Sequence, residues 1–232
     1  LLGAGTRAAV DAPLGVGDGQ NLLFQGVASV DERTFENVNV VCFARDTMIL
    51  TPSGERSVQD LSIGDEVETR DHGVQVIRWA GRRVVPAKGA LAPIVIRTGV
   101  VGNTRELRVS PLHRVLVGGW RAEMLFGERE VLVTAKHLVN GDTVFAAEGG
   151  DVEYHHILFD NHEIITANGA AAESLHPGKE SVDGFGVEAR EEIFTIFPEL
   201  RENLDAYGPV ARSSLRAFEA RVLSENPAFL NS

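Results

Sequence analysis

The sequence contains a single cysteine, Cys42, among its 232 residues. One thiol excludes an internal disulfide and any cysteine-rich metal site. Three roles then remain open for Cys42: a small buried hydrophobe, an intermolecular bridge or a nucleophile. On local grounds the segment Val41-Cys42-Phe43 favours the buried hydrophobe, because free cysteine is among the residue types most often found inside proteins.

Positive charge and long apolar runs are also scarce. The chain has 22 Lys and Arg against 33 Asp and Glu, which gives a net charge of -11. This balance disfavours a nucleic-acid partner and an anionic membrane surface, because no positive surplus is available to neutralise phosphates. No apolar stretch reaches the roughly 18 residues that a membrane-spanning helix needs. We therefore expect neither nucleic acid nor membrane as a partner.

Short β-prone segments, by contrast, are abundant. Runs rich in Val, Ile and Thr alternate with Gly, Asp and Asn turns from Val38 to about Leu175. This spacing is typical of a β sandwich or barrel-like domain, and 44% hydrophobic residues are enough for a packed core. We expect strands at residues 47–50, 66–69, 74–79, 94–97, 106–109, 115–117, 131–133, 143–146, 154–159 and 163–167.

One pattern occurs twice. The segments Leu61-Ser62-Ile63-Gly64-Asp65-Glu66-Val67 and Leu138-Val139-Asn140-Gly141-Asp142-Thr143-Val144 both read Leu-x-x-Gly-Asp-x-Val. Either a common turn has recurred by chance, or the chain consists of two related halves that face each other across a cleft.

The two ends of the chain have a different character. Residues 1–41 are glycine-rich at first and then carry short apolar pieces, which predicts an upstream flank of loop and β structure. After His176-Pro177-Gly178 the apolar spacing becomes helical, over residues 188–200 and 213–223. Pro198 must end or kink the first of these helices near Phe197. We therefore predict a small helical appendage over residues 177–232.

Two places near the predicted strand ends could carry chemistry. Cys42 stands at the head of a β run, and Ser110 with His113 places a hydroxyl and an imidazole three residues apart. A structural role is open for each, as a core cysteine and as a turn with a buried histidine.

A third group is made of histidines: His155, His156 and His162. Successive residues of a strand point to opposite faces, so at most one of His155 and His156 faces a given cleft. These residues lack the His-x-x-x-His spacing of a helical zinc site, which makes metal binding a minor alternative.

Taken together, these segments resemble the Hint superfamily, which contains hedgehog autoprocessing domains and inteins. Residues 42–49, with Gly54, Val58, Asp60-Leu61, Gly64-Asp65 and Val67, resemble its opening block. Ser110-x-x-His113 resembles the second block, usually Thr-x-x-His, and residues 152–169 resemble the late block. The three blocks occur in the family's order and cover about residues 42–176. Five further segments resemble the bacterial Hint branch that occurs in large multidomain proteins. They are residues 110–114, 135–138 and 173–178, with 207–209 and 219–221 of the tail.

The resemblance implies a mainly β, two-lobed pseudo-symmetric fold with autoprocessing activity in residues 42–176. The Cys42 thiol would attack the Val41 carbonyl in an N-to-S acyl shift, a single-turnover reaction that makes a thioester. His113 would be the acid for the leaving nitrogen, and the Ser110 hydroxyl would hydrogen-bond the scissile peptide. The base would be His155, near the place of a catalytic Asp in inteins, or His162, which matches the block's histidine; the sequence does not choose between them.

The chain departs from inteins at its end. Inteins finish in His-Asn followed by a nucleophile, whereas the matching region here is residues 170–175, Ala-Ala-Ala-Glu-Ser-Leu. We therefore expect no full splicing, and a thioester that passes to water or to a small nucleophile. The substrate would be the chain's own upstream segment, residues 1–41. No cofactor, metal or sterol-recognition region is implied.

Two alternatives remain at this point. One is a catalytically weak Hint-like structural module of a larger secreted or cell-surface bacterial protein. The other is a metal-dependent hydrolase that uses the histidines. The compartment stays open, because one cysteine fits a reducing or an oxidising setting.

Overall fold

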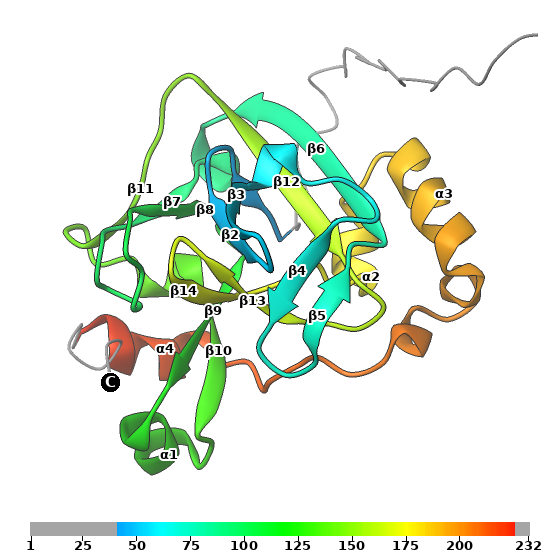
Figure 1. Cartoon of the computed structure of the whole chain (residues 1–232). Helices are drawn as coiled ribbons and strands as arrows, with labels where there is room; N and C mark the ends of the chain where they lie inside the picture. Colours follow the sequence, from blue (N-terminus) through cyan, green and yellow to red (C-terminus); the bar gives the residue numbers. More distant parts are fainter. Residues whose placement is uncertain (1–40, 226–232) are drawn as a thin grey trace, which may run out of the picture. The chain divides into compact units, whose positions relative to one another are not determined.

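The computed structural model describes residues 41–225, all of which belong to a compact unit that spans Phe35–Ser232. The predicted upstream flank, residues 1–41, therefore lies outside the described residues except for Val41. The described unit is mainly β, as the sequence predicts, with a few short helices (Figure 1). No helix among the described residues has the length and apolar character needed to cross a membrane.

The strands form two antiparallel sheets. One has six strands in the order β11-β7-β8-β1-β12-β6, and the other has eight, in the order β10-β9-β14-β13-β2-β3 with β4 paired to β13 and β5 paired to β4. The strands are β1 (Phe43–Ala44), β2 (Met48–Thr51), β3 (Gly54–Ser57), β4 (Glu66–Thr69), β5 (Gly73–Val76), β6 (Trp79–Pro86), β7 (Ile94–Ile96), β8 (Leu107–Val109), β9 (Arg114–Gly118), β10 (Glu130–Thr134), β11 (Val144–Ala146), β12 (Asp151–Leu158), β13 (Ile164–Ala167) and β14 (Ala170–Glu173).

The helical elements are short. The α-helices are α1 (Trp120–Phe126), α2 (Lys179–Asp183), α3 (Val187–Ile196) and α4 (Ala217–Ser224). The described 3-10 helices are η2 (Val58–Asp60), η3 (Gly89–Leu91), η4 (Ala135–Leu138), η5 (Pro198–Arg201) and η6 (Leu204–Tyr207).

The main core takes side chains from both sheets. Phe43 and Ile96 come from the six-stranded sheet, and Val115 and Ile165 come from the eight-stranded sheet; all four are buried in one cluster. Strands β4 and β8 alternate between buried and exposed residues, whereas β7, β9 and β10 carry three consecutive buried residues each. One shared core thus holds the two sheets together and sets the position of β1, the strand that follows Cys42.

The repeated sequence pattern has the same local structure at both places. In each copy a 3-10 helix (η2 or η4) is followed by a glycine with positive φ and a short strand (β4 or β11), and a buried leucine lies at the end of the helix or directly after it. Gly64 and Gly141 have φ of 93° and 77°, a region that favours glycine. The two copies lie in different sheets, which is the arrangement that two related halves would give.

The strand predictions hold for most of the chain, but strand β3 and residues 80–86 of β6 were not predicted. The predicted strand 74–79 is two strands, β5 and β6, separated by Ile77 and Arg78. Strand β14 and helix α1 were not predicted. The alanines of β14 have weak β propensity, and the strand exists because it pairs with both β13 and β9.

The helical appendage follows the prediction closely. Helix α3 ends at Ile196, just before Pro198, and α4 falls within the second predicted segment. The chain between them is attached to the eight-stranded sheet, since Ser213 and Leu215 both hydrogen-bond to Leu132 of β10. Helices α2 and α3 lie beside β6 and β12 (Figure 1). The division of the chain at residue 176 stays a prediction.

A second core cluster joins the appendage to the start of β1. Ile193, Phe197, Leu200 and Tyr207 of the appendage are buried in the same cluster as Val41 and Cys42. The helical tail therefore forms one side of the environment around the only cysteine of the chain.

Candidate active site

The register of β1 against β12 places Cys42 opposite His156. The two strands are antiparallel and pair Phe43 with His155 and Ala44 with Tyr154. One further step along the same register brings Cys42 across from His156, on the face opposite to that of His155. The Cys42 Sγ lies 3.5 Å from His156 Nε2.

The other nitrogen of the same ring contacts the carbonyl just upstream of Cys42. His156 Nδ1 lies 2.8 Å from the carbonyl oxygen of Val41. A carbonyl oxygen can only accept, so the neutral ring carries its proton on Nδ1 and donates it to Val41. The lone pair of Nε2 then points to the thiol. One imidazole thus contacts both atoms that an attack of Cys42 on Val41 would involve.

Burial determines the charge state of this pair. It lowers the pKa of His156 to about 4, against the opposing effect of the hydrogen bond to Val41. It also raises the pKa of the Cys42 thiol far above its usual range, which Ser110 and the Arg83 charge only partly offset. At neutral pH the pair is therefore a neutral thiol beside a neutral imidazole, which is the starting state for general-base catalysis.

The amide nitrogen of the Val41–Cys42 bond faces the second predicted cluster. The Cys42 N–H donates to Ser110 Oγ at 3.0 Å. The Ser110 N–H in turn donates to the Cys42 carbonyl at 3.0 Å, and the His113 N–H donates to the Ser110 carbonyl at 3.0 Å. Both polar groups of the peptide bond before Cys42 are thus hydrogen-bonded, the oxygen to His156 and the nitrogen to Ser110.

His113 is completely buried behind this peptide bond. Its ring packs edge-on against Phe43 at 4.3 Å between ring centroids. The ring interacts with the backbone of Cys42, which acts to raise its pKa, although neither ring nitrogen meets the full geometry of a hydrogen bond within the described part of the chain. Burial lowers the pKa of His113 to about 4, so His113 is neutral at neutral pH. The expectation that it titrates near neutrality does not fit this environment.

The structure does not bring His155 or His162 to the thiol. His155 faces the other side of the sheet, where its Nε2 lies 3.1 Å from Glu153. His162 accepts a hydrogen bond from the Ala211 N–H at 2.9 Å, and its Nε2 lies 3.1 Å from the buried carboxylate of Glu173. Through these contacts His162 connects the tail, at Ala211, to strand β14, at Glu173.

His156 is the residue to which the sequence assigned no role. The strand pattern of residues 154–159 indicates that only one of His155 and His156 can face Cys42. Which one does so depends on the register between β1 and β12, and that register is a long-range property. No cluster of three or more potential metal ligands occurs among residues 41–225.

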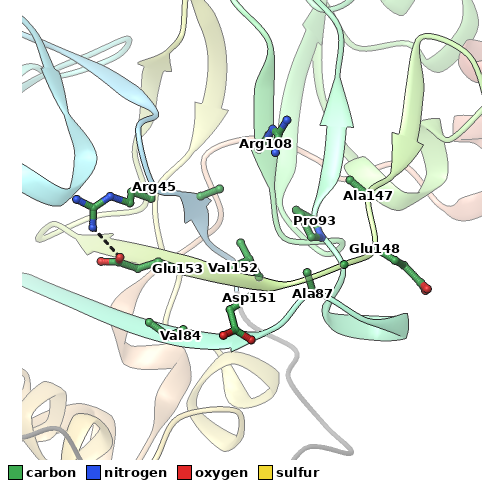
Figure 2. Close-up of a pocket in the computed structure, with 12 residues that line it drawn as sticks. Arg45, Val84, Ala87, Pro93, Arg108, Ala147, Glu148, Asp151, Val152 and Glu153 are labelled. Atoms are coloured by element: carbon green, nitrogen blue, oxygen red, sulfur yellow. Dashed lines mark hydrogen bonds and ion pairs between the residues drawn. The ribbon is translucent and has the colours of Figure 1, made fainter.

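The residues that line a cavity of about 500 Å³ include Ala44 of β1 but not Cys42. Figure 2 shows this cavity with Arg45 and Glu153 among its lining residues. Arg45 and Glu153 form an ion pair at 2.8 Å on its edge. The other residues that line it include Val84, Ala87, Pro93, Arg108, Ala147, Glu148, Asp151 and Val152. Cys42 and His156 do not line this cavity, and both lie in the protein interior, 2% and 6% exposed.

A sequence model of the Hint domain matches residues 41–179. This match covers more than half of the chain. The chain belongs to the Hint domain family. The domain is 29% identical over 111 residues to Warthog protein 1 of Caenorhabditis elegans, over 46% of this chain and 21% of that protein. The chain therefore spans only about a fifth of the length of this curated relative.

Solved structures of similar proteins include intein-related domains. A bacterial intein-like domain from Clostridium thermocellum is 14% identical, with a TM-score of 0.40, and the alignment covers 56% of this chain and 96% of that one. A DnaB intein from Synechocystis sp. PCC 6803 is 14% identical, with a TM-score of 0.37, and the alignment covers 58% and 98%. Because both TM-scores are below 0.5, membership of the family rests on the match to the Hint model.

The end of this Hint domain is built as a strand pair. Asn168 has a positive φ of 49° and its Oδ1 accepts the Met48 N–H, while its Nδ2 donates to the Glu106 carbonyl. Both ends of the amide are thus used to hold the turn between β13 and β14. Ala170–Glu173, where an intein would carry its terminal asparagine, is β14 itself.

Proposed function

We propose that this Hint domain processes its own chain at the Val41–Cys42 bond. In this proposal the Cys42 thiol attacks the Val41 carbonyl in an N-to-S acyl shift. The resulting thioester is hydrolysed or passed to a small nucleophile, without full splicing. The observation that supports this most strongly is that His156 contacts Cys42 Sγ through one ring nitrogen and the Val41 carbonyl oxygen through the other.

The first step uses both nitrogens of His156. Nε2 takes the proton of the Cys42 thiol as the sulfur forms a bond to the carbonyl carbon of Val41. The Nδ1 proton stays hydrogen-bonded to the carbonyl oxygen, where negative charge develops. The imidazolium formed in this way stabilises that charge, so one side chain provides general-base catalysis and part of an oxyanion hole.

The second step breaks the bond between the Val41 carbon and the Cys42 nitrogen. This nitrogen is a poor leaving group unless it takes up a proton, and the proton that left the thiol is the one that balances the step. Ser110, whose hydroxyl lies 3.0 Å from the nitrogen, holds it in place. We assign to His113, three residues after Ser110, the transfer to the nitrogen. It takes over the proton that the His156 imidazolium holds and passes it to the nitrogen, so that both imidazoles are neutral when the bond has broken.

The fold assists by holding the reacting groups in contact. Val41 and Cys42 are 6% and 2% exposed, so water does not compete for the hydrogen bonds of the site. Fixing nucleophile and carbonyl in a reactive arrangement can contribute up to roughly 7–11 kcal/mol. The upstream segment is the substrate, and the missing asparagine end makes water or an external nucleophile the final acceptor.

The test follows the mass of the chain. The purified full chain is incubated at neutral pH with and without dithiothreitol or hydroxylamine, and the products are weighed by mass spectrometry. We expect a break between Val41 and Cys42 that the nucleophile accelerates and that Cys42→Ala abolishes. A wild-type chain that stays intact under every condition would refute the proposal.

One observation favours the second candidate, a structural Hint module with weak or no chemistry. Burial raises the pKa of the Cys42 thiol far above its usual range, which is typical of an inert core cysteine. The same incubation separates the two functions, because a structural module leaves no thioester for hydroxylamine to cleave.

A further inference from the structure

Two aromatic rings pack against the imidazole of His156. The ring of Trp79 lies 6.2 Å from that of His156 at an interplanar angle of 29°. Phe185, from the segment between α2 and α3, approaches edge-on, 5.4 Å from His156 and 5.5 Å from Trp79. The imidazole is therefore held between the reacting atoms of β1 and this pair of rings.

The position of the indole depends on a glycine. Gly81 of β6 pairs with His156 of β12, and Trp79 precedes it by two residues on the same face. A Cβ atom at position 81 would lie 2.2 Å and 2.6 Å from two ring atoms of Trp79. The indole can thus lie over the backbone of Gly81 and next to His156 only because position 81 has no side chain.

The helical appendage fixes the far edge of the indole. The Trp79 Nε1–H donates to the Glu192 carboxylate of α3 at 2.9 Å. Trp79 itself is 2% exposed. The tail thus supplies two contacts to the wall behind His156: the ring of Phe185 and the carboxylate that holds Trp79.

We propose that Trp79 is a positioning residue for His156, seated over Gly81 and held by Glu192 of the appendage. This inference rests on the proposed self-processing reaction. The indole keeps the imidazole in the orientation that joins Cys42 to Val41, and it keeps water away from the ring. The appendage is then part of the active site and not an independent module.

If Trp79 positions His156, its replacement should make the rate of cleavage depend on pH. A purely structural role of Trp79 would not produce this dependence. Burial holds the pKa of His156 at about 4, so the base is unprotonated over the whole neutral range. If water enters where the indole was, the pKa rises toward the usual histidine value of about 6.5. The charged or titratable groups near His156 are Cys42 just before β1, Arg83 on β6, Tyr154 and His155 on β12, and His113. The appendage contributes Glu192 at the far edge of Trp79.

The experiment compares cleavage of the full chain at pH 6 and pH 8. In Trp79→Leu and in Gly81→Ala we expect the ratio of the rate at pH 6 to that at pH 8 to fall by up to about fourfold, because protonation then removes most of the base at pH 6. The ratio cancels any loss that is independent of pH. Matched controls are Trp120→Leu, at the exposed tryptophan of α1, and Gly118→Ala, where a Cβ meets only ordinary contacts.

A second measurement does not depend on cleavage. The titration of His156 is followed by NMR in the Cys42→Ala chain, with and without Gly81→Ala. We expect Gly81→Ala to raise the pKa of His156 and Gly118→Ala to leave it unchanged. An unchanged pKa together with an unchanged rate ratio overturns the inference about Trp79, whereas a wild-type chain that never cleaves overturns the self-processing proposal itself.

Discussion

Replacement of His156 is the sharpest test of how the Val41–Cys42 bond is attacked. An ordinary thiol with a pKa near 8.5 is only about 3% ionised at pH 7. Burial raises the pKa of Cys42 well beyond that value, and each further unit lowers the thiolate fraction tenfold. The uncatalysed thiolate is therefore negligible, and nearly all attack at neutral pH must pass through proton transfer to a base.

The magnitude of the loss follows from the two contacts of the ring. A positioned general base is worth about 10²–10⁴ in rate, and a donor to a developing oxyanion about 10²–10³. Because one imidazole serves both functions, the two effects do not simply multiply. We expect His156→Ala to slow cleavage by about 10³-fold or more.

Two further variants separate the base from the donor. In His156→Asn the amide nitrogen can stand near the place of Nδ1 and still donate to the Val41 carbonyl, but no base remains. We therefore expect His156→Asn to cleave slowly, yet faster than His156→Ala. His155→Ala is the matched control, since His155 is the adjacent histidine on the other face of the sheet and contacts Glu153.

The assay is the rate of appearance of the two fragments by mass spectrometry, at neutral pH with excess dithiothreitol. Circular dichroism checks that each variant is folded. A folded His156→Ala chain that cleaves at close to the wild-type rate would show that another group is the base. A large loss in His155→Ala with little change in His156→Ala would return the role to His155, one of the two candidates for the base that the sequence left open.

The remaining predictions concern the nitrogen side of the bond and the stability of the buried histidines. Ser110→Ala removes the acceptor of the buried Cys42 N–H. The loss of this hydrogen bond costs about 1–3 kcal/mol, and cleavage should become slower. Ser110→Thr keeps the hydroxyl and should cleave at close to the wild-type rate. Burial holds His113 neutral in the folded state down to about pH 4, whereas the unfolded chain takes up this proton below about pH 6.5. The free energy of unfolding should therefore fall on acidification from about pH 6.5 to pH 4, by up to about 1.4 kcal/mol per pH unit for this residue. Urea denaturation at several pH values should show a shallower decline in His113→Gln, and an unchanged slope would contradict the assigned burial of the neutral ring.

The strands that the sequence identified are those in which local pattern and tertiary role agree. The Val- and Ile-rich segments that became β9, β10 and β13 contain consecutive buried residues, so they are buried on both faces, as their apolar runs indicate. The two copies of Leu-x-x-Gly-Asp-x-Val also carry their structure locally, because a glycine with positive φ and a buried leucine suffice to form the turn. Strand β14 is different, since its alanines have no strong preference for a strand and depend on β9 and β13.

The candidate site likewise contains residues that local sequence identifies and one residue that depends on tertiary structure. Cys42, Ser110 and His113 were identified from sequence, because each belongs to a short segment with its own spacing. The histidine that contacts Cys42 could not be identified from such a segment. His155 and His156 are neighbours, and a shift of one residue in the pairing of β1 with β12 would exchange them.

The sequence by itself therefore determined the family, and it pointed to Cys42 and the Val41–Cys42 bond as candidates, since these are properties of contiguous residues. Only the tertiary structure decided which imidazole meets the thiol, that burial keeps this imidazole neutral, and that the helical tail completes its environment. The physical reason is that the register of the strands, the burial of His156 and the position of Trp79 over Gly81 all depend on contacts between segments that are far apart in the chain. Cys42 is 2% exposed, as in an ordinary core, and what distinguishes it is the ring that the opposite strand places beside it.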